Sequence, residues 1–199
     1  MTPKRLFDLL CAAIGLLVLL PVMALVALAV WLDSDGPVIF RQVRVGRGVQ
    51  PFTIYKFRTM TAAPASRGPG ITVGHDARIT RVGRWLRATK IDELPQLFNV
   101  LRGDMSLVGP RPEVPEYVSA FPELFSRLLR VRPGITDPAS IAYRNEAAIL
   151  AMAGDPDREY RQRILPDKLR LSTEYAEHAS LRSDIALIFQ TLFSVGRES

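Results

Sequence analysis

The sequence predicts a mainly helical α+β fold in which an N-terminal membrane helix precedes one further domain. Residues 9–32 contain no charged residue, and this stretch exceeds the roughly 20 apolar residues that a helix needs to cross the bilayer core. Two β-rich runs surround residues 46–48, and apolar residues recur at helical spacing after position 78. We therefore divide the chain into a membrane helix over 1–32 and one domain over 33–199, a length too short for two ordinary domains.

Pro21 lies near the middle of the apolar stretch. Proline removes a helical hydrogen bond and clashes with the carbonyl four residues earlier, so it bends or breaks a helix. A bent segment can enter and leave the bilayer by the same face, but many spanning helices also tolerate a proline. From the residues alone, a re-entrant helix and a helix that crosses once both remain open.

Basic residues flank the apolar stretch on both sides. Lys4 and Arg5 precede it, and Arg41, Arg44 and Arg47 follow it. Because positive residues tend to stay on the cytoplasmic side of a membrane, both ends are predicted to be cytoplasmic. A secretory signal cleaved near residues 27–29 is a weaker alternative, because its apolar core would usually have only about 7–15 residues.

Charge and cysteine content narrow the class of protein. Cys11 is the single cysteine and lies in the apolar stretch, so a disulfide framework and a cysteine-based zinc site are excluded. The formal net charge is +6, and because Lys4, Arg5 and Asp8 contribute +1 before position 33, the domain carries +5. Such a surface favours anionic lipids, phosphorylated substrates or nucleic acid, without distinguishing among them.

The residues after the membrane stretch predict a β-hairpin followed by a loop. Residues 37–60 form two β-rich runs around the turn Gly46, Arg47 and Gly48. Residues 61–76 are small and rich in proline and glycine, without an apolar period. This composition predicts a mobile surface loop.

A basic stripe predicts an amphipathic helix over residues 78–87. Arginine recurs at every third position, with apolar residues between, at Arg78, Arg81, Arg84 and Arg87. A stripe of one sign lacks the acidic partners of an ordinary salt-bridged surface, so contact with phosphate or lipid is favoured over a merely solvated face.

The next helix is predicted to begin with an acidic pair. The spacing from Thr89 to Asp92 fits a capping box, although Pro95 moves the start toward Ile91 or Asp92. Asp92 and Glu93 then lie in its first turn. Its predicted buried stripe is Leu94, Leu97, Phe98 and Leu101. Further helical patterns cover residues 145–163 and 166–194.

Most common catalytic motifs are absent from the sequence. There is no P-loop, no complete dinucleotide loop and no serine elbow, and the two histidines stand far apart. What remains is the carboxylate pair Asp92 and Glu93 among basic residues. Acidic residues at a helix start are often only favourable partners of the helix dipole, so the pair alone does not establish catalysis.

Several long, ordered blocks resemble the signature of the bacterial sugar transferase family, the monotopic phosphoglycosyl transferases. They are YKFRTM at 55–60, LR at 86–87, DELPQLFNVL at 92–101, GDMS at 103–106 and VGPRP at 108–112. Because the blocks are closely spaced and cover nearly the whole chain, the resemblance is far more specific than any single short motif.

The resemblance implies transfer of a phosphosugar from a nucleoside diphosphate sugar, usually a UDP-sugar, to polyprenyl phosphate, with release of the nucleoside monophosphate. It implies Asp92 as nucleophile and as a ligand of the required Mg²⁺, with Glu93 as its partner. The expected location is the cytoplasmic face of the bacterial inner (plasma) membrane, where such products begin glycoconjugate or polysaccharide synthesis. Membrane lipid is a further partner, nucleic acid is not expected, and a homodimer is compatible with the family.

The resemblance also implies a fold with a re-entrant membrane helix broken at Pro21 and with amphipathic interfacial helices. Independently of the family, an anionic nucleophile approaching a diphosphate requires cations to cancel the repulsion. Arg87 and Arg111 are the predicted phosphate-binding residues, because guanidinium groups meet phosphate oxygens two at a time, and Lys56 is a further contact.

Two departures from the family pattern limit what can be transferred. Leu20 stands where members often have serine before the proline, and residues 137–146 replace a block that many relatives share. If that segment meets the sugar or the nucleotide, donor identity does not carry over.

The alternative function is a membrane-tethered module that binds anionic lipid or nucleic acid through the basic stripe.

Overall fold

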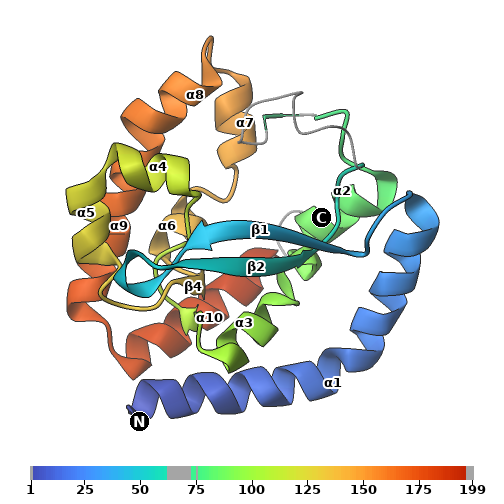
Figure 1. The fold of residues 1–199 in the computed structure, drawn as a ribbon, viewed down its shortest axis with the longest axis horizontal. Helices are drawn as coiled ribbons and strands as arrows, with labels where there is room; N and C mark the ends of the chain where they lie inside the picture. The colour runs from blue at the N-terminus through green and yellow to red at the C-terminus, as the bar shows by residue number, and fades with distance from the viewer. Residues whose placement is uncertain (1, 62–72, 75, 196–199) are drawn as a thin grey trace.

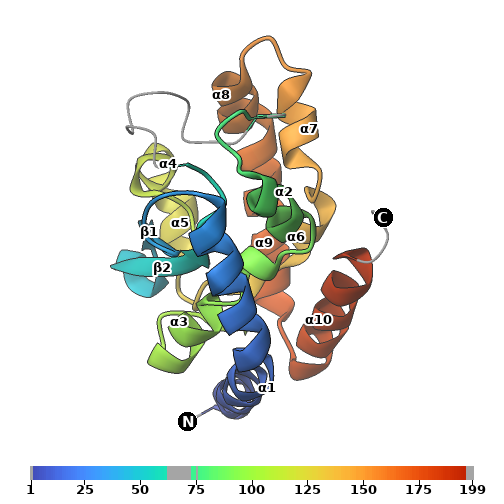
Figure 2. The same cartoon turned by 90° about the vertical axis from the view of Figure 1, so that its right-hand side faces the viewer.

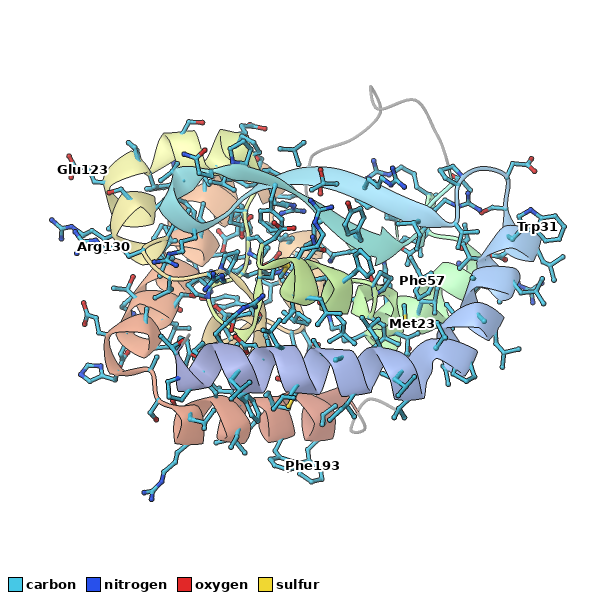
Figure 3. The ribbon with its side chains drawn as sticks, turned by 60° about the horizontal axis from the view of Figure 1, so that its bottom comes forward. Met23, Trp31, Phe57, Glu123, Arg130 and Phe193 are labelled. Carbon is cyan, nitrogen blue, oxygen red and sulfur yellow. The ribbon has the colours of Figure 1, made fainter. Side chains whose placement is uncertain are left out.

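The N-terminal helix α1 (Pro3–Asp33) is continuous over 31 residues and bends near its middle (Figures 1 and 3). The computed structural model describes residues 2–61, 73–74 and 76–195. Pro21 lies inside α1, and Met23 lies near the bend. The helix is therefore bent at the proline rather than broken, which corrects the prediction of a broken helix. The turns on either side retain their hydrogen bonds while the proline removes one.

The bend divides α1 into a first arm before Pro21 and a second arm after it, and both arms pack against the domain. In the first arm, Ala12 is fully buried in an apolar cluster with Leu97 and Val100. In the second arm, Val26 and Val30 are buried in a separate cluster with Phe57 and Leu86. The bend thus lets one helix follow two faces of the domain.

Two arginines hold the two ends of α1 on the domain. Arg5 Nη2 donates to the carbonyl of Val100 at 2.8 Å, at the end of the helix α3 (Gln96–Arg102). Arg58 Nη2 donates to the carbonyl of Val30 at 3.1 Å, and its Nη1 donates to Pro37 at 2.9 Å. These bonds join the first turn of α1 to the end of α3, and the last turn of α1 to the residue that follows β2.

The outer surface of α1 is apolar. Among the described residues, α1 is the one helix long and apolar enough to cross a membrane, and only 11% of its most apolar window is buried inside the protein. Its exposed side chains include Leu10, Ile14, Leu17, Val18, Leu20, Leu25, Leu28, Trp31 and Leu32. An apolar surface of this extent is typical of contact with lipid.

The predicted β-hairpin is confirmed. Strands β1 (Ile39–Val45) and β2 (Pro51–Phe57) pair antiparallel, with Ile39 opposite Phe57, and the short turn η1 (Arg47–Val49) joins them. The hairpin tip is attached to the domain, because Gly48 N donates to the carbonyl of Leu129 at 2.7 Å. This attachment fixes β2, which carries Lys56.

Val49, at the hairpin tip, has a left-handed backbone conformation with φ 61°. A β-branched side chain clashes with its own backbone there, at a cost of roughly 1–2 kcal/mol. We expect Val49→Gly to raise the free energy of unfolding by about 0.5–1 kcal/mol after the entropy cost of glycine. Thermal unfolding of the detergent-solubilised protein measures the change. Val43→Gly, in β1, should destabilise instead, and a less stable Val49→Gly would contradict the strain.

The remaining elements form a helical domain on one side of the hairpin (Figures 1 and 2). Short strands β3 (Ser106–Val108) and β4 (Gly134–Thr136) pair in parallel. The helices, besides α1 and α3, are α2 (Arg81–Ala88), α4 (Pro115–Ala120), α5 (Pro122–Leu128), α6 (Pro138–Ala142), α7 (Glu146–Ala151), α8 (Pro156–Glu159), α9 (Leu165–His178) and α10 (Leu181–Val195). A π-helical turn, η3 (Tyr160–Ile164), joins α8 to α9. The mainly helical α+β class is confirmed.

Several predicted helix boundaries were wrong. Helix α2 begins at Arg81 rather than at 78, because Thr80 Oγ1 caps it by accepting from Gly83 N at 2.9 Å. The pattern over 145–163 is divided into α7, α8 and η3. The pattern over 166–194 is divided into α9 and α10, because Ala179 is extended and Ser180 Oγ accepts from Ser183 N at 3.2 Å. Most of the predicted loop 61–76 lies outside the described residues.

The predicted buried stripe of α3 is also corrected. Leu97 is buried, but Phe98 is 55% exposed, and Asn99 and Val100 are fully buried instead. The chain before α3 winds with three residues per turn, which shifts the buried face. Asn99 bridges α3 to β2, since its Nδ2 donates to Thr53 O at 2.7 Å and its Oδ1 accepts from Tyr55 N at 3.1 Å.

Candidate functional site

The acidic pair lies in the short 3₁₀ turn η2 (Ile91–Glu93), between α2 and α3. Lys90 has a left-handed backbone conformation with φ 57°, which ends α2 and redirects the chain. Thr89 Oγ1 donates to the carbonyl of Trp85 at 2.9 Å, so it belongs to the end of α2 and the predicted capping box is wrong. Asp92 and Glu93 are 7% and 9% exposed. This burial separates them from ordinary acidic residues at a helix start.

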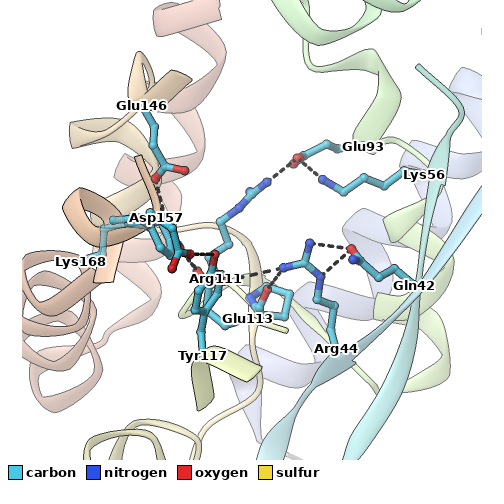
Figure 4. A network of polar contacts seen from close by, with 12 residues as sticks. Gln42, Arg44, Lys56, Glu93, Arg111, Glu113, Tyr117, Glu146, Asp157 and Lys168 are labelled. Atoms are coloured by element: carbon cyan, nitrogen blue, oxygen red, sulfur yellow. Dashed lines mark hydrogen bonds and ion pairs between the residues drawn. The ribbon is translucent and has the colours of Figure 1, made fainter. Parts of the chain in front are cut away.

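Glu93 is held by two cations from distant parts of the chain (Figure 4). Lys56 Nζ donates to its Oε1 at 2.7 Å, and Arg111 Nη2 donates to the same oxygen at 2.8 Å. Burial alone would raise the pKa of Glu93, but the charges of Arg111 and Lys56 outweigh it and hold that pKa well below its usual range. Glu93 is therefore an ionised anchor for both cations.

Asp92 has the opposite environment. Its Oδ1 is buried and has no hydrogen-bond partner among the residues that the structure describes. Burial raises the pKa of Asp92, and the charge of Glu93 raises it further, against the opposing charges of Lys56, Lys90 and Arg87. A buried polar atom without a partner is rare and costly, so it is typical of a site that awaits a ligand.

Arg87 reaches the site because α2 packs closely on the end of β2. A Cβ atom at Gly83 would lie 2.1 Å from the carbonyl oxygen of Thr59, so this approach requires glycine. Arg87 Nε then donates to Thr59 Oγ1 at 2.9 Å. Burial lowers the pKa of Arg87, and the charge of Asp92 opposes that shift most strongly. The guanidinium group therefore remains charged near the carboxylates.

The structure brings together five of the six residues singled out from the sequence, and places the sixth elsewhere. Lys56 and Arg111 pair with Glu93, and the adjacent Asp92 is close enough to Lys56 and Arg87 for their charges to act on it. Pro21 lies apart from them, inside α1. Of the basic stripe, Arg78 is paired with Asp76 at 2.6 Å ahead of α2, whereas Arg81 and Arg84 are exposed on its surface.

A buried polar network beside Arg111 was not predicted (Figure 4). Tyr160 Oη donates to Glu113 Oε1 at 2.8 Å, and Arg44 Nη1 lies 3.7 Å from Glu113 Oε2. Lys168 Nζ donates to Glu146 at 2.8 Å and to Tyr160 Oη at 3.3 Å. Burial, and then the charge of Glu113, raises the pKa of Tyr160 far above its usual value, so it stays a neutral donor. The network joins β1, η3 and α9.

The divergent segment 137–146 packs mainly on α9. Asp137 Oδ2 accepts from Ser172 Oγ at 2.6 Å while its Oδ1 caps α6. Tyr143 Oη donates to Asp167 at 2.7 Å, and Glu146 pairs with Lys168. These polar side chains thus have partners within the fold. Their long-range pairing explains why sequence spacing gave no signal for them.

Gln96, at the start of α3, is a buried polar residue that the sequence analysis did not single out. It is 1% exposed, and its Nε2 has no hydrogen-bond partner among the described residues. Its position four residues after Asp92, within the matched block at 92–101, is the signal that could have identified it.

Comparison with known proteins supports the family resemblance seen in the sequence. The family model described as bacterial sugar transferase matches residues 1–198. An undecaprenyl-phosphate glucose phosphotransferase of Komagataeibacter xylinus is 42% identical over 96% of this chain and 35% of its own length. A UDP-N-acetylgalactosamine-undecaprenyl-phosphate N-acetylgalactosaminephosphotransferase of Aeromonas hydrophila is 40% identical over 96% and 43%.

A relative of similar length is also found. The exopolysaccharide production protein PSS of Rhizobium leguminosarum bv. phaseoli is 38% identical over 96% of this chain and 94% of its own length. By contrast, the chain spans less than half of the two relatives above. The family match nevertheless covers almost every residue, including all blocks around Asp92 and Glu93. The chain belongs to the bacterial sugar transferase family.

Proposed function

We propose that this chain transfers a phosphosugar from a nucleoside diphosphate sugar, most simply a UDP-sugar, to polyprenyl phosphate. The observation that carries the proposal is the buried, unpartnered Oδ1 of Asp92, on which the positive charges of Lys56, Lys90 and Arg87 act. The names of two relatives, which pair undecaprenyl phosphate with glucose or N-acetylgalactosamine transfer, support the same reaction class. The sugar itself is left open.

The proposed reaction has two displacements at one phosphorus atom. A carboxylate oxygen of Asp92 attacks the phosphorus that bears the sugar, the bond to the bridging oxygen breaks, and the nucleoside monophosphate leaves with the electron pair. A phosphate oxygen of the polyprenyl phosphate then attacks the same phosphorus. The bond to Asp92 breaks, which releases the polyprenyl diphosphate sugar and restores the carboxylate. Two displacements let a soluble donor and a lipid acceptor use one site in turn.

The cations of the site fit this chemistry. Two like charges about 4 Å apart repel by roughly 4 kcal/mol at an effective dielectric of 20, so an ionised Asp92 requires compensation to approach a diphosphate. We assign Arg87 and Arg111 to the phosphate oxygens and Lys56 to a further contact. Arg111 and Lys56 are already held in place by Glu93, so little reorganisation is needed when charge develops in the transition state.

The donor set also fits Mg²⁺. Among the described residues there is no cluster of three or more histidine, cysteine or carboxylate side chains. Mg²⁺ commonly uses one or two protein carboxylates together with substrate phosphates, and the unpartnered Oδ1 of Asp92 is such a ligand. When bound, the ion would neutralise charge on the phosphate oxygens.

Titration of Asp92 tests both its environment and this metal ligand. In the metal-free enzyme, we expect the pKa of Asp92 to lie above that of an ordinary aspartate, so it is protonated at higher pH than usual. Lys90→Gln should raise the pKa further, because it removes a charge that favours ionisation, whereas added Mg²⁺ should lower it. Infrared difference spectra against Asp92→Asn measure the protonated carboxyl. A pKa insensitive to Mg²⁺ would contradict the ligand assignment.

We also propose that α1 is a re-entrant membrane helix whose two ends remain on the cytoplasmic face of the bacterial inner membrane. Three features support this topology: the bend near Pro21, the packing of both arms on the domain, and the arginine contacts at both ends. Membrane-impermeant labelling of tags at residues 1 and 199 tests it. Labelling of the two tags from the same side of a vesicle is expected, and labelling from opposite sides would restore the spanning helix.

The activity is tested with a panel of nucleoside diphosphate sugars, polyprenyl phosphate and Mg²⁺. We expect release of one nucleoside monophosphate per lipid-linked sugar formed, with at least one UDP-sugar as donor. A phosphosugar adduct on Asp92 should appear when the lipid acceptor is omitted. Salt-sensitive binding of anionic lipid or nucleic acid, without turnover of any donor, would instead favour the membrane-tethered binding module.

A further inference from the structure

Arg111 lies in the segment between β3 and α4, which forms neither helix nor strand. A proline stands on each side of it, and proline has no backbone N–H to donate. The segment is therefore held largely through its carbonyls, by bonds from other elements. Gly134 N of β4 donates to the carbonyl of Pro110 at 3.0 Å, and Val45 N of β1 donates to the carbonyl of Glu113 at 3.0 Å.

The side chain of Glu113 is buried two residues after Arg111. Its Oε1 accepts from Tyr160 Oη at 2.8 Å and lies 3.7 Å from Lys168 Nζ. Its Oε2 lies 3.7 Å from Arg44 Nη1, and the Glu113 side chain is only 8% exposed. A buried ionic network seldom stabilises a fold more than well-packed apolar side chains would, so stability alone does not explain these contacts.

The side chain of Arg111 extends from this held segment toward the acidic pair (Figure 4). Its Nη2 donates to Glu93 Oε1 at 2.8 Å. The pKa of Arg111 is raised above its usual value, chiefly by the charge of Glu93 and also by the charges of Glu113 and Glu146, against the effect of burial. Glu113 is therefore bonded into the segment that carries Arg111 and lies close enough for its charge to act on the guanidinium group.

We propose that Glu113 is a positioning residue for Arg111: the contacts of Glu113 with Tyr160, Lys168 and β1 fix the segment that directs the guanidinium group toward the donor phosphates. The inference rests on the proposed function, in which Arg111 binds phosphate oxygens. Glu113 itself does not touch the substrate. A guanidinium group that is held in place beforehand needs little reorganisation when charge develops on the phosphate in the transition state.

The variants Tyr160→Phe and Tyr117→Phe form a matched pair that tests the proposal. The two rings lie 4.8 Å apart, and each variant removes one hydroxyl group. The hydroxyl of Tyr160 donates to Glu113, whereas that of Tyr117 donates to Asp157 Oδ1 at 3.2 Å. We expect Tyr160→Phe to lower kcat about fivefold while KM for the donor changes less than about twofold, because the loss falls on the transition state. Tyr117→Phe should leave both within about twofold of the wild type.

A double-mutant cycle separates positioning from a general role in the core. We expect Glu113→Gln to lower the single-turnover rate of nucleoside monophosphate release about 30-fold, but less than about threefold when Arg111→Gln is already present. The second loss is small because no guanidinium group remains to be placed. Thermal unfolding in detergent identifies the variants that are folded at the assay temperature. If Glu113→Gln does not fold, the two tyrosine variants decide.

Equal losses from Glu113→Gln in the two backgrounds, or equal losses from the two tyrosine variants, would assign the network to the core alone and overturn the proposal. An active wild type with unaffected Glu113→Gln and Tyr160→Phe variants would refute only the role of Glu113. A wild type that turns over no nucleoside diphosphate sugar would refute the proposed function itself, and the positioning role with it.

Discussion

Asp92→Asn is expected to lower the transfer rate by about 10⁴-fold or more while leaving the fold at least as stable as the wild type. The amide retains the size of the side chain but provides no carboxylate to form the covalent adduct that we propose. The same change removes a buried charge that lies next to Glu93 and whose Oδ1 has no partner. We therefore expect a gain in the free energy of unfolding of about 1 kcal/mol.

The two effects are measured on one preparation, with nucleoside monophosphate release for activity and thermal unfolding in detergent for stability. Asp92→Ala guards against slow hydrolysis of the asparagine back to aspartate and should be equally inactive. Asp35→Asn, at an exposed position, is the control and should change neither quantity. If Asp92→Asn retained more than about a tenth of the activity, Asp92 would not be the nucleophile.

Local sequence patterns were sufficient to predict α1 and the hairpin. The charge-free run and the alternation around Gly46–Gly48 are signals within one segment, and each depends on burial or pairing of that segment with near neighbours. The bend of α1 also followed from Pro21. That both arms pack on the domain did not, because this packing depends on Arg5, Arg58 and clusters formed by distant residues.

The site was predicted as a set of residues but not as a geometry. The charge types around Asp92 and Glu93 could be read from the sequence, and the five residues do meet. The opposite environments of Asp92 and Glu93 could not be read from the sequence, because Glu93 pairs with Lys56 and Arg111, which lie 37 and 18 residues away along the chain. The buried face of α3 was predicted wrongly for a local reason. The 3₁₀ turn before α3 has three residues per turn, so it changes which of the following side chains, among them Asn99 and Val100, face the interior.

Glu93→Gln is expected to destabilise the fold and to impair transfer together, in contrast to Asp92→Asn. The variant leaves Lys56 and Arg111 without their shared anion at a buried position. Removing one partner of a buried ion pair costs about 3–5 kcal/mol, and because the Arg111 side chain is 34% exposed we expect about 2–3 kcal/mol here. We expect transfer to fall by about 100-fold, because both cations lose the anchor that orients them toward phosphate.

A double variant separates the lost charge from a general packing defect. Adding Lys56→Met to Glu93→Gln removes one of the unpaired cations, so it should recover part of the stability but none of the activity. Glu123→Gln, at an exposed position in α5, is the matched control and should stay within about 0.5 kcal/mol of the wild type. If Glu93→Gln were as stable and as active as the wild type, Glu93 would not anchor these cations. A double variant less stable than Glu93→Gln would place the cost in packing instead. We thus expect the adjacent carboxylates to differ in the sign of their effect on stability, and we expect transfer to require both.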